Sequence, residues 1–187
     1  MKVKEFWSKT KERKTDTTFR FFLLSLRQQC NVFDNTSEKE MDAHIQKCST
    51  DHLQRYAEIY AEAFSGEPWN DAWTVENAFV HVSEILESKQ SYGLEYMVDG
   101  KVAGFILGTS MLFHYGRIFE INDLAVAVEY QGQGIATRLL EQCISDLKEQ
   151  GIKAVHLITA SEGVLPLFYQ KFGFNKEHRV MLMGRDL

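Results

Sequence analysis

A glycine-containing turn between a β-type run and a helical pattern is the segment with the clearest chemistry. LAVAVEYQGQGIATRLL spans 124–140, carries Gly132 and Gly134, and enters a helical pattern at Ile135. Glycine lets the backbone approach a ligand closely, and the first amides of a helix have no partner within it. The helix dipole adds partial positive charge at that end. The turn therefore predicts an anion site, with phosphate as the expected ligand.

Two widespread phosphate-binding motifs do not account for this turn. A P-loop requires Gly-Lys-Ser or Gly-Lys-Thr, which the segment lacks, and a dinucleotide-binding turn requires a third glycine where this chain has Thr137. A strand-to-helix turn that uses glycine only for its geometry would explain a lone Gly-x-Gly. The turn by itself leaves the anion site and the purely structural role both open.

Strand and helix patterns must position the turn. Asp99-Gly100 is a hairpin signal, and three β-type runs joined by tight turns predict an antiparallel meander. The later order of strand, helix and strand predicts a right-handed parallel crossover. Together these patterns predict an α+β fold with a mixed sheet. The expected strands lie at 43–48, 93–98, 101–112, 117–128, 152–159 and 180–183, and the expected helices at 53–64, 75–86, 135–147 and 164–172.

Four motifs in order resemble one family. Gln131-Gly132-Gln133-Gly134-Ile135-Ala136 resembles the Gln/Arg-x-x-Gly-x-Gly/Ala motif of GCN5-related N-acetyltransferases. FEINDLAV (119–126), GIKAVHLIT (151–159) and LFYQKFGF (167–174) resemble the family's fourth strand, fifth strand and late helix. The resemblance covers residues 41–187. It implies a mixed, mainly antiparallel twisted sheet flanked by helices, a splay between strands four and five, and acetyl-CoA as donor.

The resemblance also implies where acetyl-CoA binds. The strand residues Ala125 and Val126 would lie beside the pantetheine and the thioester. Many members have Asn seven residues before the late-helix tyrosine, whereas this chain has Glu162, so we transfer the role of holding the pantetheine to Ser161. The pyrophosphate would be held by backbone amides of Gln131, Gly132, Gln133, Gly134, Ile135 and Ala136, with Thr137 and Arg138 nearby.

Tyr169 and Glu120 are the expected catalytic residues. Tyr169 would protonate the CoA sulfur, as a phenol can, although it could instead only pack in the late helix. Glu120 would be the base, directly or through water, because even spacing along a strand puts it on the face of Val126. Asp123 would lie on the opposite face unless a bulge intervenes. Both carboxylates could simply be solvated or salt-bridged, and an amine that is already neutral needs no dedicated base.

The remaining residues with chemical capacity have ordinary explanations. Trp69 and Trp73 in the loop PWNDAW would either anchor that loop to the core or wall a ligand pocket. The six histidines are scattered and each is expected to be structural, and Cys143 lies on an apolar helix stripe. Three widely spaced cysteines and no Cys-x-x-Cys argue against a disulfide framework and a zinc site. No metal is expected.

Charge divides the chain near residue 40. Residues 1–30 carry 8 Lys and Arg against 3 Asp and Glu, and residues 31–187 carry 13 against 23. We predict a basic extension and linker over 1–40 and an acetyltransferase domain over 41–187. The apolar run at 19–30 is expected to be a short packed helix, with a signal peptide and a membrane-surface helix as weaker alternatives.

The predicted function is acetyl transfer from acetyl-CoA to a primary amine by direct attack in a ternary complex. The acidic body favours a cationic acceptor that is small or peptidyl. The alternative is a non-catalytic acyl-CoA-binding sensor or interaction module. We expect no transmembrane segment and no nucleic-acid partner. We expect a cytoplasmic location, and a homodimer is compatible with the sequence.

Overall fold

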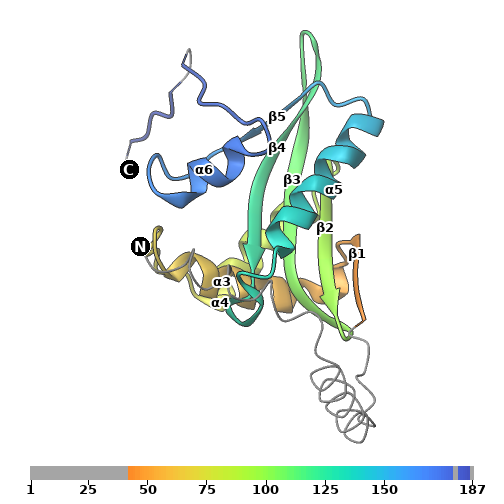
Figure 1. Ribbon diagram of the computed structural model, residues 1–187, viewed down its shortest axis with the longest axis vertical. Coiled ribbons are helices and arrows are strands. Elements are labelled where there is room, and N and C mark those ends of the chain that lie inside the picture. Colours follow the sequence, from red (N-terminus) through yellow and green to blue (C-terminus); the bar gives the residue numbers. More distant parts are fainter. Residues whose placement is uncertain (1–41, 179–180, 186–187) are drawn as a thin grey trace, which may run out of the picture. The chain divides into compact units, whose positions relative to one another are not determined.

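A five-stranded mixed sheet forms the centre of the computed structural model, which describes residues 42–178 and 181–185 (Figure 1). The strand order is β1-β2-β3-β4-β5; β4 and β5 are parallel and the other neighbours antiparallel. The predicted α+β fold is confirmed, and the predicted 1–40 extension lies outside the described residues. The strands are β1 Ala43–Lys47, β2 Ser91–Val98, β3 Lys101–Phe113, β4 Gly116–Val126 and β5 Ala154–Leu157.

Helices cover both faces of the sheet. One core cluster joins α3 and α4 to the sheet, and a second joins α5 and α6 to the other face. The Thr74 side chain accepts a hydrogen bond from the Asn77 amide and begins α4, as a helix cap does. No helix within the described ranges is long and apolar enough to cross a bilayer. The helices are α3 Leu53–Ser65, α4 Val75–Leu86, α5 Ile135–Glu149 and α6 Val164–Gln170, with 3-10 turns at Thr50–His52 and Val128–Tyr130.

The predicted strand at 180–183 is wrong for the part of it that is described. Residues 181–185 have no regular structure, and position 180 lies outside the described ranges. Met181, Leu182 and Met183 are about four-fifths exposed, at 81%, 80% and 83%. A β-type composition forms a strand only where a neighbouring strand supplies hydrogen bonds, and no strand of the described residues pairs with this segment.

A bulge in β4 changes which residues share a face. Ile121 pairs with Gly108 on β3 while Asp123 pairs with Leu107, so Asn122 is an extra residue in β4. An extra residue reverses the alternation of side chains beyond it. A Cβ at Gly108 would clash with the Glu120 backbone oxygen, so this close approach requires glycine.

The bulge corrects the predicted facing of Glu120. Its neighbour Phe119 packs in the α5 core, so Glu120 faces α3 and α4. Beyond the bulge Ala125 packs toward α3 and α4, which places Asp123 on the face of Glu120 and Val126 on the opposite one. The prediction that Glu120 and Val126 share a face is wrong, because even spacing holds only in a strand without a bulge.

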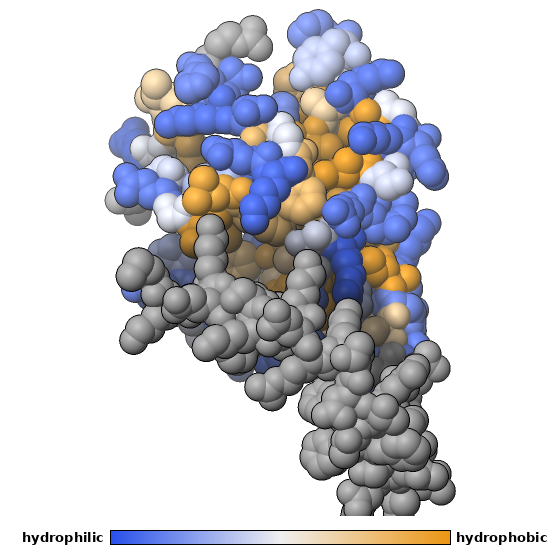
Figure 2. Space-filling model, in the orientation of Figure 1, coloured by the Kyte–Doolittle hydropathy of each residue, from blue (hydrophilic) through white to orange (hydrophobic). Residues whose placement is uncertain are grey.

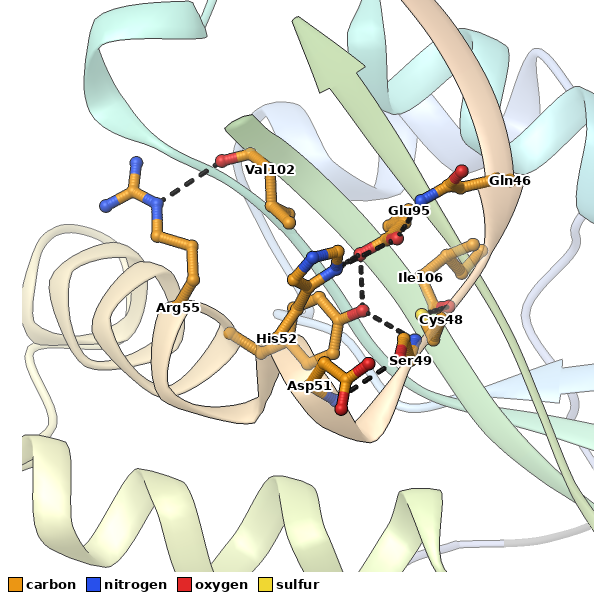
Figure 3. A network of polar contacts seen from close by, with 10 residues as sticks. Gln46, Cys48, Ser49, Asp51, His52, Arg55, Glu95, Val102 and Ile106 are labelled. Carbon is orange, nitrogen blue, oxygen red and sulfur yellow. Dashed lines mark hydrogen bonds and ion pairs between the residues drawn. The ribbon is translucent and has the colours of Figure 1, made fainter. Parts of the chain in front are cut away.

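Glu95 of β2 is a fully buried carboxylate with several partners (Figure 3). Gln46 Nε2 donates to it at 2.6 Å and His52 Nδ1 lies 2.8 Å from its Oε2. The Tyr56 hydroxyl donates at 2.5 Å and accepts a hydrogen bond from the Ser49 amide. These contacts tie β1, the start of α3 and β2 together inside the core.

Candidate active site

The strands β4 and β5 separate at one end, as predicted. Their pairing runs from Ile118 with Ala154 to Ile121 with Leu157. Beyond this point β4 continues to Val126, paired only with β3. The side of β4 that faces β5 therefore has backbone groups without a strand partner, which a ligand can use.

A cavity of about 90 Å³ occupies this separation. Aromatic side chains close it from the α3 side, and α6 closes it from the other. Apolar side chains gather at several places among charged ones on the face seen in Figure 2, and near the cavity Ile158, Val164 and Leu167 are exposed. The cavity is lined by Phe64, Trp69, Ile121, Asn122, Leu124, Leu157, Ile158, Thr159, Leu165 and Tyr169.

Tyr169 of α6 lines the cavity and also packs in the core. Its ring lies 5.7 Å from that of Phe174 and 5.1 Å from that of Phe168, between centroids. Burial raises the pKa of Tyr169 to about 12. The phenol is therefore protonated at neutral pH, as a proton donor must be.

Thr159 is a cavity residue that the sequence did not point to. Its Oγ1 is buried and has no hydrogen-bond partner among the residues that the structure describes. A buried hydroxyl without a partner costs free energy, and a polar group of a bound ligand would satisfy it. Its position two residues after the end of β5 is the only sequence signal, and many strand ends share it.

The glycine turn has the backbone geometry expected of an anion site. Gly132 has φ 74° and Gly134, the N-cap of α5, has φ 79°. A Cβ at either position would meet nothing within 4 Å, so glycine is needed here for conformation and the turn surface is open. No side chain caps α5, and its first helical hydrogen bond runs from the Arg138 amide to the Gly134 oxygen.

The side chains of the turn make local contacts. Gln131 Nε2 donates to the Val126 oxygen at 3.1 Å, and Gln133 Nε2 donates to the Glu129 oxygen at 3.3 Å. These bonds hold the turn against the end of β4. Arg138 is exposed and donates to the Tyr96 hydroxyl at 2.6 Å.

Four other predicted site residues do not line the cavity. Ala125 is buried toward α3 and α4, and Val126 is half-buried toward α5. The predicted pantetheine residue Ser161 is exposed and does not line the cavity. Glu120 is half-buried, and its neighbours across the sheet are Thr109 and His156. Within the described ranges, no three His, Cys, Asp or Glu side chains are arranged to hold a metal.

The two tryptophans of the PWNDAW loop have different roles, since one walls the cavity and the other anchors the loop to the core. Trp69 walls the cavity beside Phe64, with 5.7 Å between their ring centroids. Trp73 anchors the loop to the core, where its ring contacts Tyr60 and His81 at 4.9 and 5.3 Å.

The buried carboxylate of Asp123 pairs with His81 of α4. Nε2 of His81 lies 3.1 Å from Oδ2 and 3.3 Å from Oδ1. This hydrogen bond is the main cause that raises the pKa of His81. Burial raises the pKa of the adjacent Tyr60, and the charges of Asp123 and Asp71 add to the effect. Sequence reasoning missed the pair because His81 lies 42 residues from Asp123 in the chain.

The sequence profile of the Acetyltransferase (GNAT) family matches residues 53–174. The matched range contains the glycine turn, the separated strands and Tyr169. The chain belongs to the GNAT family of acetyltransferases. The resemblance of the four motifs is thereby confirmed, and the GNAT protein is an acyl-CoA-dependent N-acetyltransferase.

Relatives and solved structures agree with this membership. The [ribosomal protein bS18]-alanine N-acetyltransferase of Escherichia coli strain K12 is 27% identical over 65% of this chain and 72% of its own. An uncharacterized N-acetyltransferase of Archaeoglobus fulgidus is 25% identical over 60% and 79%.

The fold is shared with solved acetyltransferases. A possible acetyltransferase from Clostridium difficile 630 has a TM-score of 0.69 at 17% identity, over 78% of this chain and 98% of its own. The aminoglycoside N-acetyltransferase AAC(6')-Iy in complex with CoA has a TM-score of 0.62 at 16% identity, over 80% and 99%.

Proposed function

We propose that this GNAT protein transfers the acetyl group of acetyl-CoA to a primary amine by direct attack in a ternary complex. The cavity between β4 and β5 carries the proposal, because it brings Tyr169 and the unpartnered Thr159 hydroxyl to the place where β4 has free backbone groups. Holding two reactants together in such a site contributes a large share of the rate. The domain that does this is proposed to begin near Met41.

Acetyl-CoA is proposed to lie along the end of β4 and across the start of α5. Ala125 and Val126 would flank the pantetheine and thioester, and Thr159 is a better placed hydroxyl than Ser161 for a pantetheine polar group. Backbone amides from Gln131 to Ala136 would hold the pyrophosphate, supported by the positive φ of both glycines and the uncapped helix start. Thr137 in the first turn and Arg138 would lie nearby.

The acceptor is proposed to be a cationic amine that enters on the α3 side. The acidic balance of residues 31–187 favours a positively charged partner by long-range attraction. Two similar proteins are named for acceptors that carry amines, the alanine of a ribosomal protein and aminoglycosides. Glu120 and Asp123 face this side of the sheet, so each is a candidate to take the amine proton.

Release of thiol from acetyl-CoA tests the function. The full chain is assayed against an amine panel that includes a peptide with N-terminal alanine, an aminoglycoside, a polyamine and a lysine peptide. Tyr169→Phe should lower kcat about 100-fold, within the range of a lost general acid, while acetyl-CoA affinity stays within about twofold. Tyr115→Phe, at an exposed tyrosine of the β3–β4 turn, is the control and should retain activity.

The assay distinguishes a transferase from a non-catalytic module and tests the role of Tyr169. Tight binding of acetyl-CoA with no turnover of any amine would favour the non-catalytic acyl-CoA-binding module. Full activity of Tyr169→Phe would reject this tyrosine as the proton donor and leave the transferase activity standing.

A further inference from the structure

The Asp123–His81 pair adjoins the cavity through the chain neighbours of Asp123, and His81 itself does not line it. Asp123 is 3% exposed and stands in β4 between Asn122 and Leu124, both of which line the cavity. Two residues further along β4 is Ala125, the proposed neighbour of the thioester. The bulge at Asn122 is what turns the Asp123 carboxylate toward α4 and its histidine.

The ring of His81 is held in one orientation. It packs against the rings of Tyr60 and Trp73, with centroid distances of 4.9 and 5.3 Å. A carboxylate only accepts, so Nε2 carries the proton that is donated to Asp123. Nδ1 then has the free lone pair, and it has no hydrogen-bond partner within 42–178 and 181–185. The His81 side chain is 32% exposed, so an incoming ligand can reach it.

Aromatic contacts lead from the cavity to this ring. Phe64 and Trp69 line the cavity, Tyr60 stacks on Phe64 at 4.3 Å, and His81 follows Tyr60. An aromatic surface attracts ammonium groups through its negative faces and also accommodates an alkyl chain. The buried negative charge of Asp123 lies behind the last ring of this series.

We propose that His81, oriented by Asp123, accepts the proton of the acceptor ammonium group, and that the acceptor is a protonated primary amine whose chain lies on the aromatic wall. This inference rests on the proposed function, because it assigns the proton acceptor of that reaction. His81 is the catalytic residue in it, and Asp123 is a positioning residue.

The ammonium passes one proton to Nδ1 of His81, and the freed nitrogen lone pair forms the C–N bond with the acetyl carbonyl carbon. The C–S bond breaks and the sulfur takes its electron pair together with a proton from Tyr169. The nitrogen loses its second proton, which restores Tyr169 directly or through solvent. His81 returns its proton to solvent, so one proton is released for each amide formed.

The charges around His81 set the pH at which it can act. Asp123 of β4 and Glu84 of α4 raise its pKa, burial opposes them, and Tyr60 of α3 lies close by with Asp71 acting on it. Below the pKa of His81 the ring is cationic, so it repels the ammonium and cannot accept its proton. The acidic limb of kcat/KM against pH should therefore follow the protonation of His81.

Glu120 is the rival proton acceptor. It faces the same side as Asp123, yet it lies before the bulge, where β4 is still paired with β5. Glu120 therefore lies beside the paired part of β4 and β5, whereas Asp123 lies beside the separated part.

The experiment measures kcat/KM of the full chain from pH 5.5 to 9, with acetyl-CoA and the amine that is turned over fastest. His81→Gln should lower kcat/KM about 100-fold and remove the acidic limb. Asp123→Asn keeps the histidine but removes the charge that raises its pKa, so the limb should move to lower pH. His114→Gln, at an exposed histidine of the β3–β4 turn, should leave the profile unchanged.

The outcomes separate this inference from the proposed function. If the unaltered chain acetylates amines, and His81→Gln keeps the same kcat/KM and the same acidic limb, the inference is overturned and the proposed function stands. Loss of the limb in Glu120→Gln but not in His81→Gln would overturn it as well. No acetylation of any amine would reject both. Thermal unfolding checks each variant, and if His81→Gln does not fold, a fixed limb in Asp123→Asn overturns the inference.

Discussion

The described residues include two buried carboxylates, Glu95 and Asp123, which have similar neighbours but differ in how many protein groups bond them. Both face the α3 side of the sheet, and both have a histidine and a tyrosine beside them. Glu95 accepts from Gln46 and Tyr56 and contacts His52, so its oxygens are occupied by protein groups. A fully satisfied buried network rigidifies a core.

Asp123 has fewer protein partners and a cavity beside it. Nε2 of His81 hydrogen-bonds its two oxygens, and Tyr60 lies close enough for the carboxylate to raise the pKa of that phenol. Neighbouring residues on both sides of Asp123 line the cavity. Burial of the charge therefore does not separate the two carboxylates, and neither does exposure of their histidines, since the side chains of His52 and His81 are 33% and 32% exposed. The two differ in how many protein groups bond the carboxylate and in the separation of β4 from β5 beside Asp123.

Removal of the Glu95 carboxylate is the change with the largest expected effect on stability. Glu95→Ala leaves the buried Tyr56 hydroxyl without its acceptor, removes the acceptor of the exposed Gln46 side chain, and should lower the free energy of unfolding by about 3 kcal/mol. Urea denaturation measures this loss, and Asp123→Ala should lose less. Turnover for each folded molecule should not change in Glu95→Ala. The exposed Glu62→Ala is the control, with an effect within about 0.5 kcal/mol.

Each buried carboxylate has a tyrosine of α3 beside it, Tyr56 at Glu95 and Tyr60 at Asp123, and loss of either hydroxyl should have a smaller effect on stability. The Tyr56 hydroxyl donates to Glu95 and also accepts from the Ser49 amide at 3.0 Å. Tyr56→Phe should therefore cost about 2 kcal/mol of unfolding free energy, and Tyr60→Phe about 1 kcal/mol. Thermal or urea unfolding of both variants measures the two losses of unfolding free energy. Equal losses would mean that the two carboxylates are equally tied to the core.

The pH dependence of stability in Asp123→Asn should be the smallest of these effects. The pKa of His81 is raised on folding, so its contribution is full below the unfolded value of about 6.5 and is lost as pH rises through the folded pKa. The unfolding free energy lost in Asp123→Asn should therefore be greater at pH 5.5 than at pH 8.5. In a His81→Gln background this difference between the two pH values should vanish, and its persistence would assign the effect to another group.

Much of the fold followed from local signals. The hairpin at Asp99-Gly100, the cap at Thr74 and the stripe of α5 depend on residues close in sequence, and these elements lie where they were predicted. The segment at 181–183 shows the limit of such reasoning, since composition cannot supply a neighbouring strand. A local pattern and the family order predicted Tyr169 in the late helix, and the structure places it in α6 beside the cavity.

The sequence by itself determined the family, the glycine turn and the place of Tyr169, because turn conformation and helical periodicity are properties of short segments. Only the tertiary structure decided which carboxylates face the α3 side of the sheet. The bulge at Asn122 comes from the register between β3 and β4, and it reverses the alternation on which Glu120 and Val126 were matched. The same register brings Asp123 to His81 of α4, a contact that no local pattern encodes.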